Sequence, residues 1–377
     1  MRTVSDHLAN LIEIPSVSSM SNRGVIDYAK DTLLSAAWNV SENSYVDANG
    51  VEKVNLLASP KDEDIEDADV DLAFFCHTDT VPFAADWADA LVPIFKDGII
   101  YGCGSCDVKG FLACLLTAIE STENFKSSLR LVLTSDEEIG CIGASNLLAE
   151  DVIRPRRAVI GEPTSLQPAR AGKGYCLAEV TVRGQEAHSA HPGEGRSAIY
   201  GAARLITTIE EYAAQLSNFR DSLFSPPFTS LNVGIIQGGT AKNIVAGECK
   251  FQLEWRPLPG PSPDALLDIL RMAADQRRET DPLFTYEVKV LRRQPGFETR
   301  ADASLVTELC ALANRGATSI PFGSEASLLS SVAEEVVVFG PGDMRTAHSS
   351  RECVPVKELE EAVSILRALM SRKIDRL

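Results

Sequence analysis

The sequence of 377 residues lacks the features that mark several specialised classes of protein. No apolar run reaches the roughly 18 residues that a membrane-spanning helix needs. Basic residues are outnumbered, since 36 Lys and Arg stand against 53 Asp and Glu, and the formal net charge is −17. This charge argues against nucleic acid and against anionic membrane surfaces as partners, because both attract clustered Lys and Arg. Internal repeats and low-complexity tracts are also missing.

The cysteines do not form a pattern that predicts disulfides or a zinc ribbon. There are nine of them, an odd number without paired spacing, which fits a reducing compartment better than a disulfide framework. Cys103 and Cys106 form a lone CxxC, and a ribbon would need a second pair. Residues 1–14 resemble an amphipathic helix rather than a signal peptide, because acids and a histidine interrupt the apolar residues. We therefore expect a cytoplasmic protein.

The first 170 residues alternate between strand and helix patterns. Apolar periodicity predicts helices at 2–14, 24–37, 110–121 and 143–150, and buried strands at 54–58, 71–79, 129–134 and 157–162. This order is typical of an α/β domain with a largely parallel sheet flanked by helices.

A different pattern begins near residue 172. We expect a strand at 174–183, a helix at 196–214, strands at 228–237 and 247–256, a helix at 263–279 and a strand at 286–291. That order is the split βαβ unit of a ferredoxin-like α+β domain. The α/β pattern then resumes, with a helix at 302–314, a strand at 336–339 and a helix at 357–372. The sequence thus predicts a discontinuous first domain, 1–171 and 294–377, with a small domain, 172–293, inserted in it.

The stretch Leu129–Gly140 carries three adjacent acids at the end of a strand. Its Leu- and Val-rich run ends at Thr134 and is followed by Ser135, Asp136, Glu137 and Glu138. Ligands of open α/β sheets bind beyond the carboxyl ends of the strands, so acids at such a place are candidates for metal or proton chemistry. A solvated turn is the commoner explanation for an acidic triplet on its own.

Other strand ends carry similar side chains. The candidates are His77 with Asp79, Asp107, Glu137 with Glu138, Glu162, and His348. Imidazoles mixed with carboxylates suit zinc or cobalt, and an acid between two ions can bridge them. Each residue alone is weak evidence, but several of them at one edge of one sheet indicate a metal site.

Four motifs in this order resemble a known family, the dinuclear zinc amidohydrolases, which include deacetylases, desuccinylases, aminoacylases and several exopeptidases. They are His77-Thr-Asp79-Thr-Val-Pro, Gly102-Cys-Gly-Ser-Cys-Asp107-Val-Lys-Gly, Ser135-Asp-Glu-Glu-Ile-Gly and Gly161-Glu-Pro-Thr. The resemblance covers nearly the whole chain, and the ordered set is highly specific.

The resemblance implies a role for each candidate. His77 and Glu162 would hold one Zn²⁺, Glu138 and His348 the other, and Asp107 would bridge the two ions, with Co²⁺ as a possible substitute. Asp79 would accept the second N–H of His77 and so orient it. Glu137 would be the general base for a metal-bridged water, and Asp136 would be structural. The family also implies a cis peptide bond at Asp107–Val108.

The same resemblance makes 172–293 a dimerisation and lid domain. A histidine, His188, would then reach into the partner's active site to stabilise the oxyanion, although His191 lies three residues away and could be confused with it. Asn243 and Arg256 would bind the α-carboxylate of the substrate, Arg256 through its planar two-toothed fork. Considered without the family, these polar residues could equally be the turns of a ferredoxin-like domain.

Two segments look like the acetylornithine deacetylase branch of the family: Arg256-Pro-Leu-Pro-Gly, and Phe322-Gly323-Ser324-Glu325-Ala. Gly323, Ser324 and Glu325 become candidate substrate-binding residues. Glu325 would face the cationic side chain of ornithine, or would simply be an acid at the start of a helix. We expect hydrolysis of N2-acetyl-L-ornithine to L-ornithine and acetate, a step of arginine biosynthesis.

Several alternatives stay open at this point. Acylated amino acids differ by few pocket contacts, so N-acetylcitrulline, another N-acetyl amino acid or succinyl-diaminopimelate could be the substrate. A dipeptidase or carboxypeptidase with the same metal centre is also possible. A binding protein without catalytic activity is a further class, although a complete set of ligands and base argues against it.

Overall fold

The computed structural model describes residues 2–371, which form two compact units. Within the described residues, the first contains 2–171, Glu298–Thr318 and 324–371; the second contains Gly172–Phe297 and Ser319–Gly323. The second unit therefore extends past the expected boundary at 293, and a short segment near residue 320 joins it. Residues 372–377, which include the end of the helix expected at 357–372, lie outside the described residues.

A mixed sheet forms the centre of the first unit. Its strand order is β1-β2-β6-β3-β7-β17-β8-β15, and β16 pairs with β8. The bounds are β1 Trp38–Val46, β2 Glu52–Pro60, β3 Asp69–His77, β6 Leu129–Thr134, β7 Arg154–Gly161, β8 Ala169–Gly172, β15 Phe297–Glu298, β16 Thr318–Ile320 and β17 Glu335–Phe339. The neighbours β6, β3, β7 and β17 are parallel to one another. Their carboxyl ends consequently meet at one edge of the sheet.

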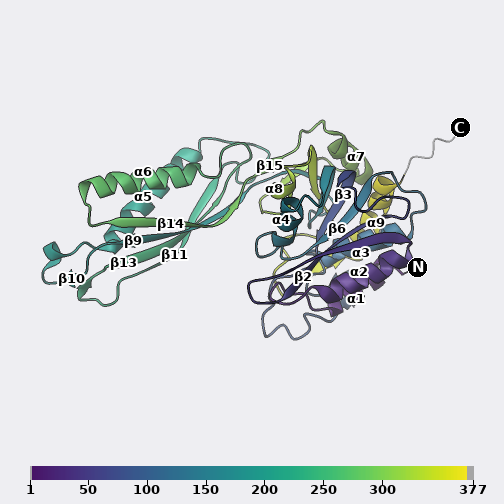
Figure 1. Ribbon diagram of the computed structural model, residues 1–377, viewed down its shortest axis with the longest axis horizontal. Coiled ribbons are helices and arrows are strands. Elements are labelled where there is room, and N and C mark those ends of the chain that lie inside the picture. The colour runs from purple at the N-terminus through teal and green to yellow at the C-terminus, as the bar shows by residue number, and fades with distance from the viewer. Residues whose placement is uncertain (1, 372–377) are drawn as a thin grey trace. The chain divides into compact units, whose positions relative to one another are not determined.

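Helices cover both faces of this sheet (Figure 1). They are α1 Val4–Glu13, α2 Arg23–Ser35, α3 Lys109–Glu120, α4 Ile142–Ala149, α7 Ser304–Ala313, α8 Ala326–Leu329 and α9 Val356–Met370. Leu8 of α1, Phe74 of β3, Leu115 of α3 and Leu366 of α9 share one buried core. The central strands β3 and β6 are buried on both faces, which explains their nearly continuous apolar runs. In Figure 1, α4 and α8 lie across the sheet from α1 and α2.

A small three-stranded sheet leads the chain toward α3. Its order is β18-β5-β4, with β4 Ile94–Lys96, β5 Ile99–Tyr101 and β18 Cys353–Pro355. After β5 the chain makes a turn that carries Asp107 and then begins α3. Asp107 therefore comes from the start of a helix, and not, as expected, from the end of a strand in the central sheet.

The second unit has the predicted ferredoxin-like topology. It contains β9 Tyr175–Arg183, α5 Ala198–Leu216, β11 Ser230–Gly238, β13 Glu248–Arg256, α6 Ala265–Thr280 and β14 Thr285–Gln294. The strand order is β11-β13-β9-β14, and each pair is antiparallel. Val180, Leu205, Phe251 and Leu270 belong to a core between the sheet and the two helices. A short pairing of β10 Ala187–His188 with β12 Ile244–Val245 lies outside this sheet.

The apolar runs predicted the buried strands better than the exposed ones. The predicted strand at 129–134 matches β6, whereas β1 was missed. Polar and acidic residues dominate β1, which leaves most of its positions partly exposed, so no apolar run marks it. Among residues 2–371, no helix has both the length and the apolarity needed to cross a membrane.

Candidate active site

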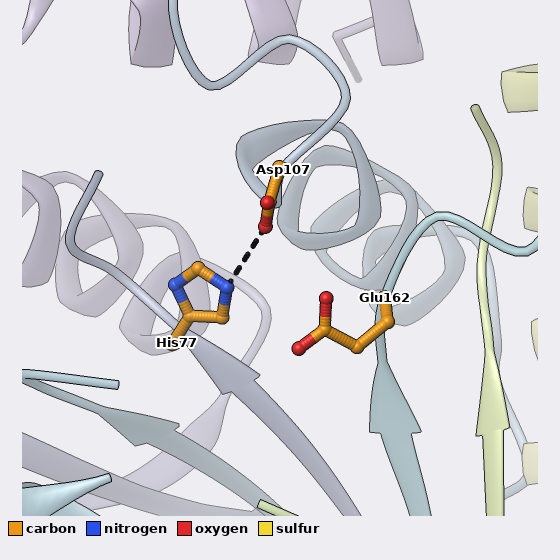
Figure 2. A group of neighbouring side chains, drawn as sticks. All are labelled: His77, Asp107 and Glu162. Carbon is orange, nitrogen blue, oxygen red and sulfur yellow. Dashed lines mark hydrogen bonds and ion pairs between the residues drawn. The ribbon is translucent and has the colours of Figure 1, made fainter. Parts of the chain in front are cut away.

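The first candidate metal group consists of His77, Asp107 and Glu162 (Figure 2). His77 ends β3, and Glu162 directly follows β7, which pairs with β3 in parallel, so the sheet brings the two together. One ligand atom of each residue lies within 4.8 Å of the others. The Nε2 atom of His77 is 3.1 Å from Oδ1 of Asp107. All three residues are buried.

The second candidate group consists of Asp107, Glu138 and His348, again with ligand atoms within 4.8 Å of one another. The Nε2 atom of His348 is 3.1 Å from Oδ2 of Asp107 and 3.2 Å from Oε1 of Glu138. Asp107 thus belongs to both groups and turns one carboxylate oxygen toward each histidine. This is the arrangement that a carboxylate bridging two ions requires.

The charges in this site depend on one another. Burial opposes ionisation of Asp107, but hydrogen bonds with His348 and His77 outweigh it and hold the pKa of Asp107 well below its usual range. Hydrogen bonds with Asp107 and Glu138 raise the pKa of His348 to about 10. Burial raises the pKa of Glu162 and of Glu138. Several carboxylates buried around two imidazoles need positive charge, and nitrogen and oxygen donors of this kind hold divalent transition-metal ions.

Contacts of His77 identify the ring nitrogen that is available to a metal. Its Nδ1 lies 3.0 Å from the main-chain carbonyl oxygen of Asp79, so this nitrogen carries the proton and donates it. In the neutral ring, Nε2 then presents a lone pair beside Asp107. The nearest carboxylate oxygen of Asp79 is 3.7 Å from Nδ1. The orienting acceptor is therefore the carbonyl of Asp79, and not the carboxylate that the sequence led us to expect.

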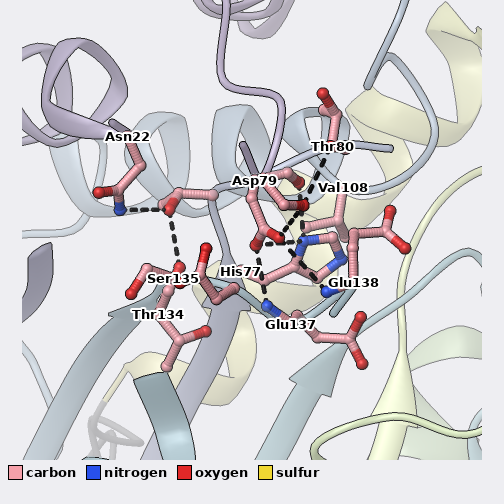
Figure 3. Close-up of polar contacts among 12 residues, drawn as sticks. Asn22, His77, Asp79, Thr80, Val108, Thr134, Ser135, Glu137 and Glu138 are labelled. Carbon is pink, nitrogen blue, oxygen red and sulfur yellow. Dashed lines mark hydrogen bonds and ion pairs between the residues drawn. The ribbon is translucent and has the colours of Figure 1, made fainter. Parts of the chain in front are cut away.

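The Asp79 carboxylate instead holds the turn after β6 (Figure 3). It accepts hydrogen bonds from the amide N–H of Glu137 at 3.0 Å and of Glu138 at 3.3 Å, and from the hydroxyl of Ser18 at 2.7 Å. These bonds fix the main chain of both glutamates. Asp79 acts on the glutamate turn as well as on His77.

Glu137 lies beside the two metal groups but belongs to neither. Its side chain is buried, and burial raises its pKa to about 8. The thiol of Cys141 lies 3.2 Å from Oε1 and donates to it. A buried carboxyl with a raised pKa next to metal ligands is the arrangement that a general base needs.

Asp136 anchors the same turn through contacts with Lys53 and Tyr45. One of its oxygens is 2.7 Å from Nζ of Lys53, and the other accepts a hydrogen bond from the hydroxyl of Tyr45 at 2.8 Å. Asp136 has a φ of 56°, in the left-handed region, so the chain changes direction there. This change allows Glu137 and Glu138 to serve one site, although neighbouring side chains of an extended strand point apart.

The turn that carries Asp107 has a partner that sequence reasoning missed. The buried carboxylate of Glu352 accepts hydrogen bonds from the amide N–H of Cys106 at 3.1 Å and of Asp107 at 3.0 Å. Nothing in the local sequence marks Glu352, because its partners are far away along the chain. The peptide bond Asp107–Val108 is cis, as expected.

The second unit contains four of the other expected residues, and it brings two of them, His188 and Asn243, together. His188 lies on β10, and the amide N–H of the next residue, Ser189, donates to the carbonyl of Asn243 at 3.0 Å. The amide N–H of Ala190 donates to Nδ1 of His188 at 3.1 Å, which leaves Nε2 as the protonated nitrogen of the neutral ring. His191 is also exposed, and its ring centroid lies 6.3 Å from that of His188.

Arg256 ends β13 and stacks on an aromatic ring. Its guanidinium carbon is 3.7 Å from the ring centroid of Tyr175, and its Nε donates to Glu254 at 2.9 Å. Arg292 approaches the same ring to 4.4 Å. Gly323 packs here too, since a Cβ added to it would lie 3.1 Å from Cβ of Tyr175. Tyr175 and Arg292 had no role in the sequence-based prediction.

Ser324 and Glu325 directly precede α8, and both are 1% exposed. The hydroxyl of Ser324 accepts a hydrogen bond from the amide N–H of Ala326 at 3.3 Å. Burial raises the pKa of Glu325 to about 7, and a hydrogen bond with Thr134, the last residue of β6, lowers it in part. Glu325 thus occupies the start of a helix, as one of the two expectations had it, with its carboxyl group inside the first unit.

Known proteins resemble this chain over nearly its whole length. Residues 73–372 match the family described as Peptidase family M20/M25/M40. An acetylornithine deacetylase from Myxococcus xanthus is 43% identical over 362 residues, which cover 95% of this chain and 94% of the relative. The match therefore includes both units and both candidate metal groups.

Solved structures share the fold. A tripeptidase from Staphylococcus aureus has a TM-score of 0.77 at 23% identity and covers 97% of this chain and 96% of its own. The YXEP protein from Bacillus subtilis, a dinuclear metal binding peptidase from the M20 family, has a TM-score of 0.68 at 14% identity, with coverage of 97% and 96%. The chain belongs to peptidase family M20/M25/M40, and it is a metal-dependent amidohydrolase of that family.

Proposed function

We propose that this protein hydrolyses the amide bond of N2-acetyl-L-ornithine to give L-ornithine and acetate. The observation that carries the proposal is the carboxylate of Asp107 between two metal-ligand groups, with Glu137 buried beside them, in a chain 43% identical to an acetylornithine deacetylase. The cytoplasmic location expected from the cysteine content is part of the same proposal.

The residues of the two groups fit a pair of divalent cations, which we take to be Zn²⁺, with Co²⁺ as the alternative. His77 and Glu162 would hold one, Glu138 and His348 the other, and Asp107 would bridge them. Such ions polarise a carbonyl oxygen and make water more acidic. Their positive charge would also lower the pKa of the nearby carboxyl groups, including Glu137.

In this proposal Glu137 moves the proton. Its carboxylate accepts a proton from the attacking water and delivers it to the nitrogen of the leaving amine. The Asp79 carboxylate and the thiol of Cys141 hold Glu137 from its main chain and its side chain. Because the base is already held in position, it needs no reorganisation during the reaction, and this lowers the activation free energy.

We also propose that the protein is a homodimer and that His188 acts across the dimer. β11 ends the sheet order of the second unit, so one of its edges is unpaired within residues 2–371, and Ile235 and Ile236 on it are each 51% exposed. An unpaired, apolar edge strand is a ready template for pairing with a second copy. The Nε2–H of His188, freed by the bond from Ala190 to Nδ1, is the donor that an oxyanion needs.

Arg256 and Asn243 are proposed to bind the α-carboxylate of the substrate. The guanidinium of Arg256 is held flat on Tyr175, which presents a planar fork suited to a carboxylate. Gly323 and Ser324 are further proposed substrate-binding residues, and Gly323 packs against Tyr175. Because Glu325 is buried, we do not assign it to the ornithine side chain.

The test is a panel of substrates with the metal-loaded enzyme. N-acetylornithine should give the highest kcat/KM, above N-acetylcitrulline, N-acetylmethionine and succinyl-diaminopimelate, and a chelator should abolish turnover. A dipeptide or tripeptide hydrolysed faster than every acyl-amino acid would replace the proposal with a peptidase. A metal-loaded preparation inactive on the whole panel would contradict both.

A further inference from the structure

The second unit contains a basic hollow that none of the proposed roles uses. It has a volume of about 980 Å³ and lies between the start of α5, the end of α6 and the turn after β11. Four cationic side chains line it: Arg196, Arg204, Lys242 and Arg277. Among its lining residues, all of them in the described part of the chain, the one carboxylate is Asp281, whose oxygen is 2.9 Å from Nε of Arg196.

The charge of this hollow opposes that of the whole chain. One of the four cations is neutralised by Asp281, which leaves three positive charges in a protein whose formal net charge is −17. Like charges gathered in a concave surface repel one another and attract an anion from solution. Although the protein as a whole is acidic, the electrostatic potential inside this hollow is positive and suits a negatively charged ligand.

Two hydrogen-bond donors beside the hollow have no partner among residues 2–371. Nε of Arg277 and the hydroxyl of Tyr286 are both shielded from water and unpaired. A buried donor left without a partner costs about 1–3 kcal/mol. Burial raises the pKa of Tyr286, and the charges of Arg277 and Arg204 lower it in part.

Two aromatic rings, those of Phe284 and Tyr286, lie next to Arg277. The guanidinium carbon of Arg277 is 5.5 Å from the ring centroid of Phe284, and the rings of Phe284 and Tyr286 are stacked with centroids 6.4 Å apart. Arg204, Arg277 and Tyr286 also line a smaller adjoining hollow of about 290 Å³. Donors for an anion therefore stand next to a flat apolar surface.

We propose that this hollow is a binding site for a small organic anion, held through a carboxylate or phosphate group by Arg204 and Arg277, with its apolar part against Phe284. None of its lining residues is among the proposed metal ligands, the proposed base or the proposed substrate-binding residues, although Ser189 and Lys242 adjoin His188 and Asn243 in the chain, so we propose it as an addition to the proposed activity. Guanidinium groups suit both anions, because their planar donors can bind two oxygens at once.

The experiment is calorimetric titration of the full-length, metal-loaded chain with succinate and, separately, with inorganic phosphate at low salt. Wild type should bind at least one of the two probes saturably, and the probe that binds identifies the anion as carboxylate or phosphate. The variant R204A/R277A should weaken this binding about tenfold or more. The matched control R271A/R278A removes two cations of α6 that pair with Asp268 and Asp275 on the surface, and it should bind as wild type does.

Tyr286→Phe is the second variant, in case R204A/R277A does not fold. Removing an unpaired buried hydroxyl should leave the Tm unchanged or higher and still weaken binding of the probe. Binding at the metal centre would survive in all of these variants, so it cannot imitate the expected loss. Absence of saturable binding to wild type would overturn the proposal. So would an equal loss of affinity in R271A/R278A and R204A/R277A.

Discussion

At the scale of single residues, the site depends on Asp107, whose two carboxylate oxygens face different histidines. Asp107 turns Oδ1 to His77 and Oδ2 to His348, each at 3.1 Å. The main-chain N–H of Asp107 donates to Glu352, and this bond holds the turn that carries the carboxylate. Because Glu137 belongs to neither group, replacing this proposed base should reduce proton transfer and leave metal binding intact.

Replacing Glu137 with Gln should therefore abolish most turnover while the metal remains. The amide keeps the shape of the carboxyl group but cannot accept the proton of the attacking water. We expect kcat to fall by about 10²–10⁴-fold, the usual contribution of a general base. Metal content measured by atomic emission should match wild type. Glu13→Gln, at an exposed position on α1, is the control and should change neither quantity. Near-normal turnover of the Glu137 variant would remove Glu137 from the mechanism.

At the scale of elements, the turn after β6 is fixed by two strands that precede it in the sequence. β3 supplies the Asp79 carboxylate just beyond its end, and β2 supplies Lys53. Asp79 bonds to the main chain of both Glu137 and Glu138, so its loss should affect both functions of the turn. This differs from the effect of changing Glu137 alone.

Asp79→Ala should accordingly lower metal occupancy and turnover together. Without the carboxylate, the amide groups of Glu137 and Glu138 lose their acceptor, and the ligand Glu138 is no longer held in place. We expect fewer than two metal ions per chain, whereas Glu137→Gln should keep both. Metal titration of the two variants side by side makes the comparison. Full occupancy in Asp79→Ala would show that the turn holds its shape without this carboxylate.

The ion pair between Lys53 and Asp136 should contribute strongly to stability. Both side chains are 1% exposed, with Nζ and Oδ1 2.7 Å apart. Lys53→Met would leave a buried carboxylate unpaired, which costs about 3–5 kcal/mol of unfolding free energy. The matched control is Lys30→Met, which breaks an exposed pair with Glu42 and should cost about 0–1 kcal/mol. Urea unfolding of the two variants measures the difference, and equal costs would contradict the assignment.

These partners show what sequence patterns could and could not reveal. The end of β6 at Thr134 was predictable because a Leu- and Val-rich run meets a polar turn, and the metal candidates were predictable because their motifs are local. Lys53 and Glu352 were not predictable, because each becomes meaningful only when folding brings it to a partner more than eighty residues away. The sequence pointed to Asp79 as the partner of His77, but whether its carbonyl or its carboxylate meets His77 depends on the main-chain path.

At the scale of the whole molecule, the shifted pKa values in the first unit make the stability of the metal-free chain depend on pH. Burial raises the pKa of Glu137 from an ordinary 4.5 to about 8, so the folded state binds a proton that the unfolded state releases. Contacts with Asp107 and Glu138 raise the pKa of His348 from 6.5 to about 10. Both groups stabilise the folded chain below their unfolded pKa and lose that contribution as the pH rises through the folded value. Asp107, with its pKa lowered, contributes steadily above pH 5.

The metal-free protein should therefore become less stable between about pH 5 and pH 9, whereas the metal-loaded protein should not. Bound cations take the place of the protons, and they bind more tightly as the ligands deprotonate, so the gap between the two Tm values should widen with pH. Thermal unfolding of chelator-treated and metal-loaded samples across this range tests the expectation. Glu137→Gln, which cannot ionise, should flatten part of the metal-free curve without affecting the contribution of His348. A metal-free Tm that stays level or rises from pH 5 to 9 would contradict the raised pKa values of these groups. The electrostatic argument that this site needs two bound cations would then fail.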